Sequence, residues 1–101
     1  MPSQLRIYKI KPGQMENWLQ FFREKVVPLH RKFGIPARIA WINPAESEFV
    51  WVRDFSDKEP VEDQERRYVS SEERLRVIGD RSKSFIDSMA VKTMQLVHEE
   101  T

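Results

Sequence analysis

The chain has 101 residues, contains no cysteine, and carries 17 basic and 16 acidic side chains for a net charge of +1. The missing cysteine excludes disulfides, thiolate nucleophiles and thiolate metal sites, and the mixing of both signs along the chain argues against nucleic acid as a partner. A chain of this length is expected to form one domain, here residues 1–101.

The first predicted element is a strand over residues 5–10. Side chains alternate between the two faces of a strand, so Leu5 and Ile7 share one face and Arg6 and Tyr8 share the other. A turn is expected directly after this strand, at the sequence Lys-Pro-Gly.

A helix is predicted from Gln14 to Phe33, because its apolar residues recur every three or four positions. Gly34 supplies the stop signal at its C-terminus. Pro28 lies inside this pattern, where it lacks an amide hydrogen and clashes with the carbonyl one turn earlier. We therefore expect a kink or a break near Val27, which displaces the last turn with His30.

Two further strands are predicted at residues 37–43 and 48–55, with a hairpin connection between them. Two matches to the Ser-x-x-Glu capping box, at residues 56–59 and 70–73, then predict the starts of two helices. The first of these helices is mostly polar and runs to about Tyr68. The second is defined by apolar residues at near-helical spacing, with residues 79–80 able to interrupt it: Leu75, Ile78, Phe85, Ile86 and Met89.

A strand over residues 91–98 completes the predicted order of strand, helix, strand, strand, helices and strand. That order is typical of a ferredoxin-like α+β sandwich, in which helices cover one face of a four-stranded antiparallel sheet. The opposite face is left bare and is expected to be apolar over several hundred Å², which monomers rarely expose. We therefore predict a homodimer with a two-fold interface of more than ~1,200 Å².

Several segments together resemble the NIPSNAP family. They are Leu5-Arg6-Ile7-Tyr8, Lys11-Pro12-Gly13, Pro28 with Gly34, the run from Phe49 to Asp57, and Arg66 with Tyr68. The resemblance implies the dimeric α/β-barrel superfamily, in which two ferredoxin-like subunits join their sheets into one barrel. It implies no particular activity, because that superfamily includes cofactor-free oxygenases, heme enzymes, isomerases and dehydratases, whereas NIPSNAP proteins have no agreed chemistry.

Arg53 is the most informative candidate site residue. Its face of the strand is otherwise aromatic, with Phe49, Trp51 and Phe55, and Asp54 points to the opposite face. A guanidinium in such a place loses hydration at a cost of several kcal/mol unless an acceptor reaches it from elsewhere. Arg53 is therefore either the anchor of a ligand carboxylate or enolate, or one partner in a structural ion pair.

The acceptors that we consider for a structural pair are the acidic residues of the following helix: Glu62, Asp63 and Glu65. Tyr8 approaches Arg53 if the strand register allows, and there it steadies a developing oxyanion or simply finds a buried partner. Arg6 shares the face of Tyr8 and either binds a ligand or pairs across the dimer.

His30 is a candidate general base or axial heme ligand, and its alternative role is a cation that complements the helix dipole. Spectroscopy of the protein with added hemin tests the heme hypothesis. No other cofactor and no metal is expected. Trp18, Trp41 and Trp51 either form a wall for a flat ligand or belong to core and interface.

Two functional hypotheses follow. The first is a homodimeric protein that binds a small molecule or serves as a scaffold, and the second is a cofactor-independent oxygenase or isomerase acting on a small, often aromatic substrate. Catalysis predicts that Arg53 and Tyr8 converge on an enclosed cavity, whereas a scaffold predicts that both meet protein partners and that no cavity remains. The N-terminus lacks a cationic segment followed by an apolar run, so we expect a cytoplasmic protein with no membrane partner.

Overall fold

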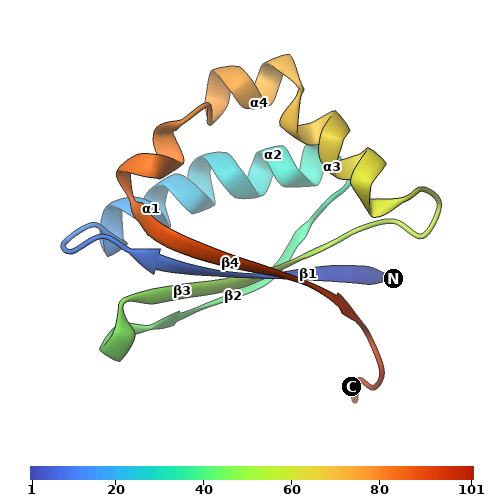
Figure 1. Cartoon of the computed structure of the whole chain (residues 1–101), viewed down its shortest axis with the longest axis horizontal. Coiled ribbons are helices and arrows are strands. Elements are labelled where there is room, and N and C mark those ends of the chain that lie inside the picture. The colour runs from blue at the N-terminus through green and yellow to red at the C-terminus, as the bar shows by residue number, and fades with distance from the viewer.

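Four strands form one antiparallel sheet in the order β2-β3-β1-β4 (Figure 1). The computed structural model describes all residues 1–101. The strands are β1 (Pro2–Ile10), β2 (Ala37–Asn43), β3 (Glu48–Asp54) and β4 (Ile86–Gln95). The helices all lie on one side of this sheet (Figure 1), which confirms the predicted ferredoxin-like α+β fold.

The first helical segment is continuous but changes its geometry along its length. It consists of α1 (Met15–Phe21), a π-helical segment η1 (Phe22–Val26) and α2 (Val27–Lys32). The distortion predicted near Val27 is therefore a π-helical stretch just before Pro28, in which the amide of Val27 donates to the carbonyl of Phe22. Gly34 follows with φ of +73°, the left-handed conformation that ends a helix.

Two short helices follow the third strand, α3 (Val61–Val69) and α4 (Glu72–Val77), and the 3-10 turn η3 (Arg81–Ser84) comes after them. A second 3-10 turn, η2 (Pro44–Glu46), connects β2 with β3. The predicted start of α3 at Ser56 is wrong, because the backbone of that residue is held by the side-chain amide of Gln64 instead. The start of α4 is displaced by one residue, since Ser71 rather than Ser70 caps the amide of Arg74.

The second predicted helix is too long and the last strand is misplaced. The helix ends at Val77, and residues 86–89 belong to β4, which runs from Ile86 to Gln95 rather than over residues 91–98. Gly79 is the physical reason, because its φ of +52° is left-handed and a Cβ there would lie 3.0 Å from the carbonyl oxygen of Leu75. The apolar spacing of residues 75–89 mimics a helix across this break.

The core between helices and sheet is dominated by aromatic rings. Five of them have neighbouring centroids between 4.7 and 6.3 Å apart: Tyr8, Trp18, Phe22, Phe49 and Trp51. Along β1 and β3 the paired residues on this face change from aromatic to polar, because Gln4 lies directly opposite Arg53. The core therefore has an aromatic end and a polar end.

The sheet face away from the helices, called the bare face below, carries apolar side chains from all four strands. Alternation and register assign to it Leu5, Ile7, Ile39, Trp41, Val50, Val52, Ala90 and Met94. Trp41, Met94 and Ile39 are 51%, 47% and 39% exposed. No helix in this chain is both long enough and apolar enough to cross a membrane.

Candidate functional site

Arg53 is held by three protein side chains and is only 4% exposed. Its Nε donates to Gln4 Oε1 at 2.8 Å, its Nη1 lies 3.0 Å from His30 Nε2, and its Nη2 donates to Glu65 Oε2 at 2.5 Å. The acceptor that the aromatic face requires is therefore supplied by the protein, with Glu65 as the ion-pair partner.

Three separate elements bring these partners to Arg53. Gln4 reaches it through the pairing of β1 with β3, His30 comes from α2, and Glu65 comes from α3. Gln4 also donates to the carboxylate of Glu65 at 3.2 Å, which ties the sheet to α3. The sequence named Glu65 among three acidic candidates but gave no signal for Gln4, whose role depends on strand register.

His30 is a neutral imidazole with both ring nitrogens engaged. Nδ1 lies 2.9 Å from the carbonyl oxygen of Val26, so it carries the hydrogen, and Nε2 is left to accept from Arg53. Burial lowers the pKa of His30 from 6.5 to about 3, and the charge of Arg53 acts in the same direction. A helix-end cation is thus ruled out, and an iron atom at Nε2 would first have to displace Arg53.

Burial also shifts the pKa values of two neighbours of His30. It lowers the pKa of Arg53 to about 10, with the nearby charge of Arg6 adding to the effect, so the guanidinium is still charged at neutral pH. Burial raises the pKa of Tyr68, whose hydroxyl lies 3.3 Å from His30 Nδ1. This end of the core therefore contains a charged guanidinium, a neutral imidazole and a neutral phenol.

Tyr8 does not reach Arg53. The register places it opposite Phe49, and its hydroxyl accepts a hydrogen bond from Arg6 Nε at 2.7 Å. Arg6 Nη1 in turn donates to Gln4 Oε1 at 2.8 Å, the same oxygen that Arg53 uses. Tyr8 and Arg53 thus belong to one hydrogen-bond network, but Arg6 and Gln4 lie between them.

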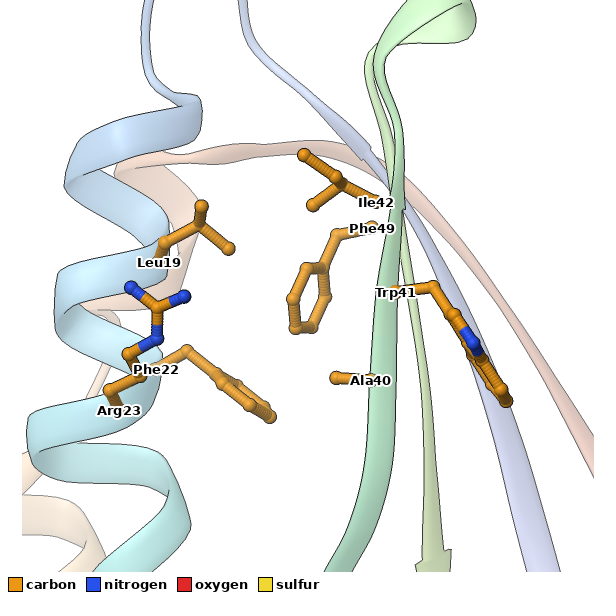
Figure 2. A pocket seen from close by; sticks show the side chains of 7 residues that line it. All are labelled: Leu19, Phe22, Arg23, Ala40, Trp41, Ile42 and Phe49. Carbon is orange, nitrogen blue, oxygen red and sulfur yellow. The ribbon is translucent and has the colours of Figure 1, made fainter.

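The three tryptophans do not gather around one space. Trp18 and Trp51 are each 1% exposed and pack against Tyr8 within the core, whereas Trp41 lies on the bare face. Figure 2 shows the ring of Trp41 turned away from the helix that faces its strand. A single wall built from all three indoles, as the sequence suggested, is not present.

The helix-facing side of β2 borders an apolar recess of about 320 Å³. Figure 2 shows Leu19 and Phe22 on the helix facing Ala40, Ile42 and Phe49 on the sheet. The remaining lining residues are Trp41 and Arg23, and Arg23 is the only charged one. Phe22 and Arg23 belong to the π-helical segment, a geometry that is frequent at functional sites.

This recess is separate from the buried network. The five main pockets have volumes of about 280 to 400 Å³, and none of them is lined by Tyr8, His30 or Arg53. The polar tips of Tyr8 and Arg53 meet protein partners instead, as the scaffold hypothesis predicts. The recess beside β2 does not fit the second part of that hypothesis, which is that no cavity remains. No group of three His, Cys, Asp or Glu side chains is placed to hold a metal ion.

Comparison with known proteins agrees with the fold. The family model described as NIPSNAP matches residues 3–98. An uncharacterized NIPSNAP domain protein from Burkholderia xenovorans superposes with a TM-score of 0.82 at 13% identity, covering 96% of this chain and 95% of that one. A NIPSNAP family protein from Agrobacterium tumefaciens gives 0.81 at 14% identity, covering 95% and 92%.

A structure described as an antibiotic biosynthesis monooxygenase is also similar, with a TM-score of 0.70 at 17% identity over 97% of this chain and 100% of that one. At such low identity these similarities show the fold alone. Comparison with curated proteins gives no match.

Proposed function

The chain belongs to the NIPSNAP family, and we propose that it is a homodimer that binds a small apolar molecule in the recess between its first helix and β2. The bare face is the observation that supports the homodimer, and the recess of Figure 2 supports the binding of a small molecule.

The bare face supports association of two copies. Trp41, Ile39 and Met94 project from the two edge strands, with the valines of β3 and the apolar side chains of β1 between them. Burial of apolar surface contributes roughly 25 cal/mol of favourable free energy per Å², and an isolated chain does not gain it from this face. A two-fold axis recovers this free energy, because the same patch on a second copy is complementary to itself.

The recess supports binding of a small apolar molecule. Its lining is apolar except for Arg23, and its volume is at the lower end of the range of known ligand pockets. Ile42 points into it and is still 45% exposed, although Phe49, its partner on the neighbouring strand, is buried. An apolar ligand would remove this side chain from water.

Substituting Trp41 on the bare face is expected to abolish the dimer. Trp41→Glu places a charge within the proposed interface, where it would lose its hydration. Sedimentation equilibrium should then give 12.1 kDa, the mass of one chain, instead of twice that mass. Leu75→Glu is the matched control, because Leu75 is equally exposed but lies on α4, and this variant should remain dimeric. A natural chain that sediments as a monomer at all concentrations contradicts the proposal.

Filling the recess is expected to abolish ligand binding without affecting the dimer. The neutral fluorophore N-phenyl-1-naphthylamine should gain fluorescence with the natural chain, since it enters apolar sites. Ala40→Phe projects a ring into the recess and should weaken its binding at least about tenfold. Val69→Phe, on exposed α3, is the control and should bind normally. Equal binding by the natural chain and by Ala40→Phe would place the fluorophore elsewhere.

The alternative function is a cofactor-independent oxygenase or isomerase. One observation favours it, because the buried network contains a neutral imidazole with a strongly lowered pKa beside a cation, at His30 and Arg53. We place it second, since the atoms of Tyr8, His30 and Arg53 that would act on a substrate are bonded to one another or to other protein groups.

A further inference from the structure

The edge of the sheet opposite the recess has a second opening. Met89 and Val91 of β4 are paired with Tyr8 and Arg6, so their side chains point to the side of the helices. Both are nevertheless poorly covered, with exposed fractions of 52% and 43%. The helical layer therefore leaves an apolar strip of β4 open to solvent.

Arg6 lies at this opening, and every partner it has is uncharged. Its Nε donates to the hydroxyl of Tyr8, its Nη1 to the amide oxygen of Gln4, and its Nη2 to the thioether sulfur of Met89 at 3.7 Å, a weak acceptor. No carboxylate lies within ion-pair distance of Arg6. Arg6 is only partly buried, so a molecule can approach it from solvent.

The surroundings of Arg6 have an excess of positive charge. Arg6 and Arg53 both donate to the single oxygen Gln4 Oε1, and the carboxylate nearest to this pair, Glu65, is bound to Arg53. Two guanidinium groups are thus served by one carboxylate. The protein supplies no second anion to this end of the core, so an external anion would be favoured there.

We propose that Arg6 binds the carboxylate of a small molecule whose apolar part lies on Met89 and Val91. A guanidinium has five N–H groups, and three of them are used in the contacts above. The others, one on each Nη, remain for a carboxylate, whose two oxygens match the planar fork of the guanidinium. The proposed ligand has an apolar part as well, because that part would cover the exposed side chains of Met89 and Val91.

Arg6 is already fixed in the orientation that such a ligand needs. The bonds to Tyr8 and Gln4 hold the guanidinium from two sides. Its Cζ atom lies 5.6 Å from the ring centroid of Tyr8 and 5.9 Å from that of Trp51. A side chain held in this way loses little rotational freedom when it binds a ligand. This site uses none of the residues that line the recess of Figure 2, so experiments can test it independently of the proposed function.

The test is a titration of the isotope-labelled chain with benzoate and with benzamide, its neutral counterpart, followed by amide chemical shifts. Benzoate should shift the resonances of β1 and β4 around Arg6 and Met89, and benzamide should not. Arg6→Met keeps the apolar stem and should raise the benzoate Kd by about tenfold or more. Arg31→Gln, at an exposed position on α2 that lines neither site, should leave that Kd unchanged.

Met89→Glu is a second variant, which replaces the weak thioether acceptor of Arg6 but leaves Arg6, Tyr8 and Gln4 in place. It offers Arg6 an internal carboxylate at an exposed position, and it should abolish the benzoate shifts while leaving the chain folded. The proposal is overturned if benzamide binds as well as benzoate, if Arg6→Met or Met89→Glu binds benzoate normally, or if the shifts appear only around the recess. The last result would leave the recess as a ligand site while excluding Arg6.

Discussion

Acidification from pH 7 to pH 5 is expected to lower the free energy of unfolding by about 2 kcal/mol through His30 alone. The pKa of this residue is about 3 in the folded chain and 6.5 in the ordinary, unfolded state. Below pH 6.5 the unfolded chain therefore binds a proton that the folded chain does not accept until about pH 3. Stability is lost over that window at about 1.4 kcal/mol per pH unit.

The physical cause is that protonation of the His30 imidazole removes the acceptor for its hydrogen bond with Arg53. Protonation would put hydrogens on both ring nitrogens, and Nε2 would then face the guanidinium of Arg53 donor to donor. Burial among aromatic rings removes the water that could otherwise solvate the new charge.

Urea unfolding at pH 7, 6 and 5 measures this effect, at one fixed chain concentration because a dimer makes stability concentration-dependent. His30→Gln retains an acceptor for Arg53 but cannot titrate, so it should lose most of the acid sensitivity. His98→Gln is the matched control, since His98 is exposed near the C-terminus and should not change the pH profile. An unchanged profile in His30→Gln would contradict the assignment.

Glu65→Leu is expected to destabilise the chain by about 3 kcal/mol, because it leaves Arg53 as a buried cation without a counter-charge. The cost is increased by Arg6, whose positive charge already opposes that of Arg53. Glu62→Leu is the control on the same helix. Glu62 is exposed and in no ion pair, so its substitution should change stability by less than about 0.5 kcal/mol.

The double variant Arg53→Leu with Glu65→Leu distinguishes the free energy that the ion pair contributes to stability from the cost of leaving one charge buried alone. Removing both charges should recover part of the loss seen in Glu65→Leu, because an apolar pair of similar size can replace a buried ion pair at little cost. Recovery will be incomplete, since Gln4 and His30 lose their donor. If the two single losses simply add, Arg53 and Glu65 are not energetically coupled.

The fold could be predicted from the sequence because its signals are local. The alternation around Arg53, the Pro28 break and Gly34 each act within one element, and the order of elements then leaves few arrangements of a sheet. The end of α4 was missed for a similar local reason. Gly79 can be read as a residue within a helix or as its end, and only its left-handed conformation decides.

The candidate site could be predicted only in part. The aromatic face of Arg53 showed that an acceptor had to exist, but not which one, since Gln4 depends on strand register and Glu65 on how α3 lies over the sheet. The neutral state of His30 could not be derived either, because it follows from burial beside a guanidinium that is 23 residues away in sequence. Arg6 was named as a ligand-binding candidate, although its lack of a carboxylate partner is visible only in three dimensions.

The π-helical segment explains how His30 comes to face the sheet at all. Trp18, Phe22, Val26 and His30 are all buried, at strict intervals of four residues. In a helix of 3.6 residues per turn, four residues cover about 40° more than one full turn. Three such intervals would therefore place the imidazole of His30 about 120° around the helix axis from the indole of Trp18. The wider turn over residues 22–26 cancels much of this drift. The π-helical segment thereby sets the direction of a side chain four positions beyond its last residue.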